Sequence, residues 1–262
     1  MKKADLDRLA DNPKLISGIH NYCDRWCERC AFTKRCLSFA MEQEENRQHG
    51  GAAQDKEAFW KRFEASLALT REMIDDMAKA QGVTVDEAEL AQIGRALRRR
   101  KREARSHPVA QAALAYGAMA QEWFKSGEGS LHAKEEEILA QAKLGVASVQ
   151  EEVASLTDVV EILRWYQHQI YVKLVRGFNA DRDHEATSGF PKDSEGSVKV
   201  ALIAMDRSIA AWLRMKDFFP EQTDSILTML LHLDRLRRGA EKGFPNARAF
   251  VRPGFDTGDL PE

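Results

Sequence analysis

The four cysteines of this 262-residue chain all lie between Cys23 and Cys36. Their spacing is C-x3-C-x2-C-x5-C, through Cys23, Cys27, Cys30 and Cys36. In a chain for which we expect no signal peptide, such clustering indicates metal ligation rather than a framework of disulfides. Four thiolates match either a closed structural zinc site or a [4Fe-4S] cluster. The sequence therefore predicts one metal centre in this segment.

The conformation of the backbone around the cysteines decides between zinc and [4Fe-4S]. On a continuous helix, Cys23, Cys27 and Cys30 share one face, with Cβ atoms of neighbours about 5–6 Å apart. Zinc holds its sulfur ligands within about 4 Å of one another. A continuous helix therefore favours the wider cluster, whereas a turn at Trp26 or Glu28 favours zinc. We expect [4Fe-4S], with zinc as the alternative.

Cations and histidines lie close to the cysteines in sequence. The cations are Arg25, Arg29, Lys34 and Arg35. We expect them to lower the pKa of the thiols and to offset the charge of an anionic centre. His20 and His49 are near enough in sequence to replace a cysteine as a ligand.

Part of this segment resembles a known metal clasp. Cys27, Cys30 and Cys36, with Phe32 between them, follow the spacing of the three-cysteine clasp of iron-staple nucleases in recombination and CRISPR adaptation. That clasp binds a [4Fe-4S] cluster with a distant fourth cysteine, so the resemblance implies a cluster here with the local Cys23 as fourth ligand. It implies no nuclease activity, because the acidic and lysine motif of the nuclease core is absent. The whole segment also resembles that of uncharacterised bacterial helical proteins with a four-cysteine opening, which implies no activity.

The composition is that of a soluble globular protein. The net charge is −2 and 44% of the residues are hydrophobic, which excludes a generally basic nucleic-acid coat. No stretch approaches the roughly 20 apolar residues that a membrane helix needs. The first residues are charged and lack the apolar segment of a secretory signal. We therefore expect a cytoplasmic protein that does not contact the membrane, and the resemblance of the cysteine segment to bacterial proteins implies a bacterial source.

Apolar residues recur at helical spacing along almost the whole chain, which predicts an all-α, multi-helix bundle. Three parts are expected: a cysteine-rich metal-binding segment at residues 1–50, a helical bundle at 51–240, and an extended tail at 241–262 packed on the bundle. The helix over residues 157–178 is apolar nearly all round and is predicted to be central. Two further stripes predict bundle helices; they contain Phe59, Phe63, Leu67, Ile74 and Met77, and then Leu90, Ile93 and Leu97.

Glu161 and His168 form a second candidate site on the predicted central helix. They share one side with Asp158 and Trp165, opposite the strongest apolar stripe, where we expect a semi-buried interface. A carboxylate and an imidazole on one face can bind a metal or act as an acid–base pair. A diiron bundle repeats Glu-x-x-His on paired helices, and this chain has no such repeat. The alternative function is a helical-bundle metalloenzyme with its site around Glu161 and His168.

A basic helix face offers a third function. It consists of Arg95, Arg98, Arg99, Arg102 and Arg105. Such a face can grip the phosphates of a nucleic acid or contact a protein partner. The sequence favours a solvated helix end instead, because cations stabilise the negative end of a helix dipole and no aromatic residues or glycines are interleaved.

No P-loop, Rossmann glycine motif or G-x-S-x-G elbow is present, so nucleotide and serine hydrolysis have no support. The leading hypothesis is a helical metalloprotein whose centre has a structural, redox-sensing or partner-binding role.

Overall fold

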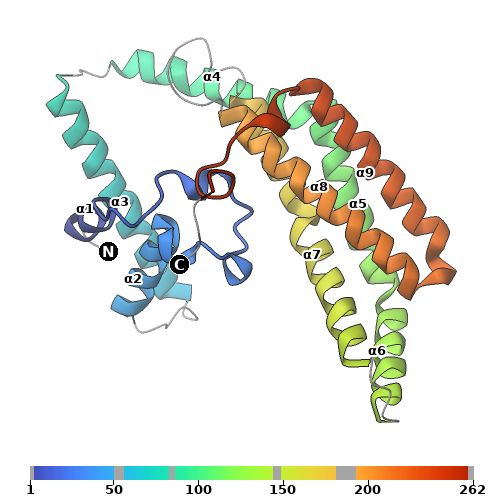
Figure 1. Cartoon of the computed structure of the whole chain (residues 1–262). Helices are drawn as coiled ribbons and strands as arrows, with labels where there is room; N and C mark the ends of the chain where they lie inside the picture. The colour runs from blue at the N-terminus through green and yellow to red at the C-terminus, as the bar shows by residue number, and fades with distance from the viewer. Residues whose placement is uncertain (1–2, 50–55, 83–85, 144–148, 181–192, 259–262) are drawn as a thin grey trace. The chain divides into compact units, whose positions relative to one another are not determined.

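The computed structural model describes residues 3–49, 56–82, 86–143, 149–180 and 193–258 (Figure 1). Every element within these ranges is an α-helix or a short 3₁₀ helix, which confirms the all-α prediction. The α-helices are α1 (Lys3–Ala10), α2 (Leu37–His49), α3 (Lys56–Ala80), α4 (Glu87–Ser106), α5 (Pro108–Ser126), α6 (Glu128–Lys143), α7 (Val149–Ala180), α8 (Asp193–Phe218) and α9 (Thr223–Gly243). Among these described helices, none combines the length and the apolar character that a membrane span requires.

The chain divides into two compact units, which differ from the three predicted parts. The first unit contains residues 1–98 and 251–262, and the second contains residues 99–250. Helix α3 and most of α4 therefore belong with the cysteine segment rather than with the bundle. The predicted tail is also divided. Phe244 and Ala247 are buried in the second unit, whereas the chain from Val251 onward belongs to the first.

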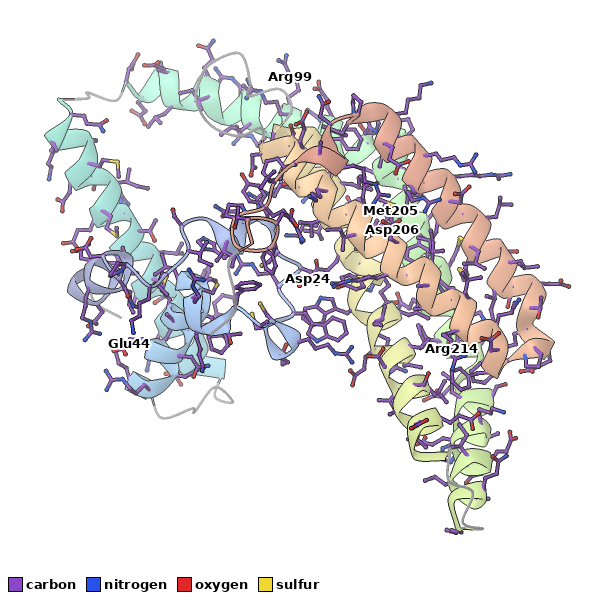
Figure 2. All side chains as sticks on the ribbon, viewed as in Figure 1. Asp24, Glu44, Arg99, Met205, Asp206 and Arg214 are labelled. Carbon is purple, nitrogen blue, oxygen red and sulfur yellow. The ribbon has the colours of Figure 1, made fainter. Side chains whose placement is uncertain are left out.

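The second unit is a bundle of α5 to α9, in which α7 and α8 make the most extensive contact (Figure 1). The stripe predicted to be central lies on α7, where Leu163, Tyr166, Ile170 and Leu174 are all fully buried. On α8, Met205 is fully buried, while the adjacent Asp206 binds Arg237 and Arg248 at the edge of the bundle (Figure 2).

Helix α5 approaches α7 closely because its contact face is made of small residues. The helix begins at Pro108, after the side chain of His107 accepts a hydrogen bond from the backbone N–H of Val109 at 3.2 Å. A Cβ atom at Gly117 would lie 2.8 Å from the carbonyl oxygen of Gln167 on α7. No side chain larger than hydrogen therefore fits at this crossing without moving the helices apart.

In the first unit, α1 packs on α2 through polar contacts. Glu44 on α2 binds Arg47 at 2.6 Å and Arg8 of α1 at 3.6 Å (Figure 2). In the predicted apolar stripes of α3 and α4, by contrast, the large apolar side chains with described positions, among them Leu67 and Ile93, are exposed. Helical periodicity gives the direction of an apolar face, but it does not determine what covers that face.

Candidate metal centre

The backbone of the cysteine segment turns instead of continuing as a helix. Arg25 adopts a left-handed conformation with a φ of 59°. One 3₁₀ helix spans Cys27–Arg29 and a second spans Thr33–Arg35. Each is followed by a cysteine with extended backbone, Cys30 after the first and Cys36 after the second. This is the conformation for which the spacing of the cysteines favours zinc over the wider cluster.

These turns bring the four cysteines to the wall of one cavity of about 20 Å³. A volume of roughly 10–15 Å³ is enough for one water molecule, so the cavity has room for a single small body. The remaining wall is largely apolar and includes Ile19, His20, Trp26, Phe32, Phe39 and Phe255. Of the two histidines considered as substitute ligands, His20 lines the cavity, and the side chain of His49 lies outside the described residues.

The four sulfur atoms are not arranged as a coordination polyhedron in this structure. Within the described ranges, no three Cys, His, Asp or Glu side chains are grouped closely enough to hold a metal ion. Two of the sulfurs make hydrogen bonds: the thiol of Cys23 donates to the carbonyl oxygen of His20, and Cys30 Sγ accepts from the backbone N–H of Phe32, both at 3.4 Å. The bond to Cys30 favours the thiolate form, in which cysteine binds a metal.

The prediction that nearby cations lower the pKa of the thiols is wrong for the two cysteines with a resolved shift. Burial raises the pKa of Cys27, and repulsion from the other three cysteines raises it further. Burial also raises the pKa of Cys30, against the lowering effect of the Phe32 N–H.

The nearby cations are bound to other groups. Arg25 donates to Ser38 at 2.7 Å, and the guanidinium of Arg29 lies 4.1 Å from the ring centroid of Trp26.

The C-terminal segment completes the cavity, a feature that the sequence analysis missed. Phe255 lines the cavity and packs edge-on against Phe32, with ring centroids 5.2 Å apart. The guanidinium of Arg252 lies over the ring of Phe255 and also binds Asp256 at 3.0 Å. Gly254, at a φ of +76°, is buried against Ile19. Spacing along the chain gives no signal for a contact between segments this far apart.

The other candidate residues do not form comparable sites. Asp158, Glu161 and His168 on α7 are exposed, so the expected semi-buried interface is wrong for the described structure. The face of Arg95, Arg98, Arg99, Arg102 and Arg105 lies on α4 and is exposed along its length. Arg99 is 3.9 Å from Glu103 in an exposed ion pair.

Comparisons of the chain with protein-family models, with curated proteins and with solved structures find no match. The resemblances of the cysteine segment therefore stay predictions.

Proposed function

We propose that this chain is a metalloprotein in which Cys23, Cys27, Cys30 and Cys36 together hold one metal centre that stabilises the first unit. The observation that carries the proposal is that all four cysteines line the same small cavity. The 3₁₀ turns favour one zinc ion in tetrahedral coordination. A [4Fe-4S] cluster on the same four residues is the alternative, and a redox-sensing role belongs to that form because zinc has no redox chemistry.

The charge of the segment supports a four-thiolate centre. Residues 23–36 contain four cations, Arg25, Arg29, Lys34 and Arg35, and two acids, Asp24 and Glu28, so their side chains carry a net charge of +2. Four thiolates around one Zn²⁺ ion carry a net charge of −2. The +2 charge of these side chains therefore balances the −2 charge of the centre. This balance does not require any cation to contact a sulfur atom.

The small core of the first unit supports a structural role for the metal. Among the described residues of this unit, Ile19 and Tyr22 are the hydrophobic side chains that are buried. A unit that buries little apolar surface needs another source of stability, such as a disulfide or a metal. Zinc binding by four cysteines can contribute roughly 10–16 kcal/mol of apparent free energy, which becomes folding free energy when the unfolded chain has no site.

Metal analysis of the full chain tests the proposal, with Cys27→Ser as the main variant. We expect the anaerobically purified protein to contain about one zinc ion per chain and no sulfide. The Cys27→Ser variant should lose most of this metal, and its first unit should melt at a lower temperature because ligand binding stabilises that unit. The measurements are iron, zinc and sulfide assays combined with thermal unfolding.

His168→Ala is the matched control, because His168 belongs to the competing site and should leave metal content unchanged. If the wild-type protein contains iron and sulfide in equal amounts and Cys27→Ser loses both, the centre is the [4Fe-4S] alternative and not zinc. Unchanged metal content and melting temperature in Cys27→Ser would contradict the centre itself. Loss of sulfide-free iron in His168→Ala would favour the metalloenzyme alternative.

A further inference from the structure

Helix α3 carries an apolar seam that is exposed along its length. The exposed fractions are 52% for Trp60, 47% for Phe63, 55% for Leu67, 59% for Ile74 and 59% for Met77. With Thr70 in the middle, these positions are separated alternately by three and four residues. That alternation is the a/d pattern of a coiled coil, in which the seam faces a partner helix.

A helix with an exposed apolar face needs a partner that packs against that face. Helix α3 has 25 residues and is therefore about 37 Å long. Single helices are marginally stable in water, and most of their stability in proteins comes from packing of the apolar face. Contiguous exposed apolar surface on a folded protein marks an interaction site. The question is which helix the seam of α3 accepts.

We propose that α3 pairs with α3 of a second copy of this chain in an antiparallel, two-stranded coiled coil. One alignment places every seam residue opposite another seam residue. Trp60 faces the partner's Met77, Phe63 faces the partner's Ile74, and Leu67 faces the partner's Thr70. Because the seam is symmetric about its midpoint, the two-fold relation of a homodimer repeats each of these pairs.

The charges that flank the seam select this orientation. Glu64 and Arg71 occupy equivalent positions beside the seam, one heptad apart, and both are exposed. In an antiparallel coiled coil such positions face each other across the interface, so Glu64 meets the partner's Arg71 and Arg71 meets the partner's Glu64. In a parallel pair, Arg71 would lie beside the partner's Ser66 and would find no acid. Charges at these positions set partner choice and orientation in coiled coils.

The alternative partner for the seam of α3 is α4 of the same chain. Leu90, Ile93 and Leu97 on α4 are also exposed, by 53%, 47% and 50%. In the hairpin that aligns the two seams, Leu67 would face Arg100, which places a cation at the centre of the apolar interface. Self-pairing of α3 contains no charged seam position, so it is the better-matched interface.

Molar mass in solution tests the proposal, measured on the full chain by light scattering or sedimentation. We expect twice the chain mass of 29.6 kDa. Leu67→Glu should give the monomer mass, because it places a carboxylate in the middle of both seams. Leu227→Glu is the matched control: Leu227 lies on α9 and is 49% exposed, so the same substitution there should leave the dimer intact. Circular dichroism and metal content should be unchanged in both variants.

Charge reversal identifies the partner helix. Glu64→Arg should raise the dimer Kd by roughly tenfold or more, because both interfacial ion pairs become repulsive. Adding Arg71→Glu should restore the original Kd, since the pairs are then re-formed with reversed sign. A monomeric wild-type protein, or a dimer that survives Leu67→Glu, would overturn the proposal. A dimer that the double reversal fails to restore would overturn the antiparallel pairing of α3 with α3.

Discussion

The two units of this chain are both helical, but they differ in how much apolar surface they bury. In the second unit, α5, α7, α8 and α9 contribute large side chains that are wholly inside, such as Tyr116, Tyr166 and Trp212. In the described part of the first unit, Ile19 and Tyr22 are the buried hydrophobic side chains. Helices α1, α2 and α3 are also less hydrophobic on average than α5, α7 and α8. The first unit therefore needs interactions other than a core.

The second unit shows what a sufficient core looks like. Trp212 packs against Trp123, with ring centroids 5.0 Å apart, and its indole N–H donates to the hydroxyl of Tyr116 at 3.0 Å. Burial raises the pKa of Tyr116 to about 12, so the hydroxyl stays protonated and neutral at physiological pH. The first unit instead gathers four thiols around a cavity and leaves the seam of α3 exposed. Metal binding and self-pairing would supply what its core does not.

The largest expected effect is at the centre of the second unit. Trp212→Ala should lower the free energy of unfolding of this unit by about 3–5 kcal/mol, because it leaves a large cavity and removes the indole N–H that Tyr116 accepts from. Metal content should not change, since the cysteines belong to the other unit. Denaturant unfolding followed by circular dichroism measures the first quantity, and a metal assay measures the second.

Leu213→Ala on the same helix is the control for this prediction. Leu213 is 48% exposed, so its truncation should cost less than about 1 kcal/mol. Similar losses in the two variants would show that the second unit does not depend on its core, and the contrast between the units would fail.

A smaller effect is expected where the C-terminal segment packs on the first unit. Gly254→Ala would place a Cβ atom 2.7 Å from Cδ1 of the buried Ile19, at a φ of +76°. We expect the first unit to lose roughly 1–3 kcal/mol from overpacking in addition to the backbone strain, and to bind its metal more weakly. Gly258→Ala isolates the contact, because Gly258 has a φ of +75° and no neighbouring atom within 4 Å. Thermal unfolding measures both effects. If the two variants are equally destabilised, backbone strain alone explains the loss and overpacking against Ile19 does not contribute.

The sequence predicts well those features that depend on neighbours along the chain. The stripe of Leu163, Tyr166, Ile170 and Leu174 identifies the buried face of α7, because residues three and four apart lie on one face of a helix. The cysteines are also close in sequence, so short turns suffice to bring them to one cavity.

Features that depend on distant segments were missed or wrong. Phe255 reaches the cysteine cavity from the other end of the chain, and no spacing rule connects it to Phe32. The direction of the Cys27 and Cys30 pKa shifts was wrong for a related reason. Neighbouring cations are visible in the sequence, whereas burial, which is the larger cause, comes from tertiary packing.

For the proposed metal centre, the raised pKa values of Cys27 and Cys30 imply an affinity that depends on pH. Cysteine binds a metal as the thiolate, so each protonated thiol must lose its proton when the metal binds. Because the pKa values of Cys27 and Cys30 lie above the ordinary value of 9.0, both are protonated at neutral pH in the metal-free protein. The two protons released by Cys27 and Cys30 alone raise the apparent affinity by about 100-fold per pH unit, which is about 1.4 kcal/mol for each proton. Affinity therefore increases as the pH rises and is lost as it falls.

Competition with a chelator between about pH 6.5 and pH 8.5 measures this slope. We expect a steady increase through the whole range, because the pKa values of Cys27 and Cys30 lie above it. An affinity that levels off above about pH 7 would mean that the thiols are already ionised, as at a helix N-terminus or beside bound cations. The first unit would then hold a preformed anionic site, and its stability without metal would have to come from ion pairs with Arg25, Arg29, Lys34 or Arg35. With the expected slope, Cys27 and Cys30 of the metal-free first unit are neutral and the core of that unit is small, so we expect metal binding and folding to be coupled there as they are not in the second unit.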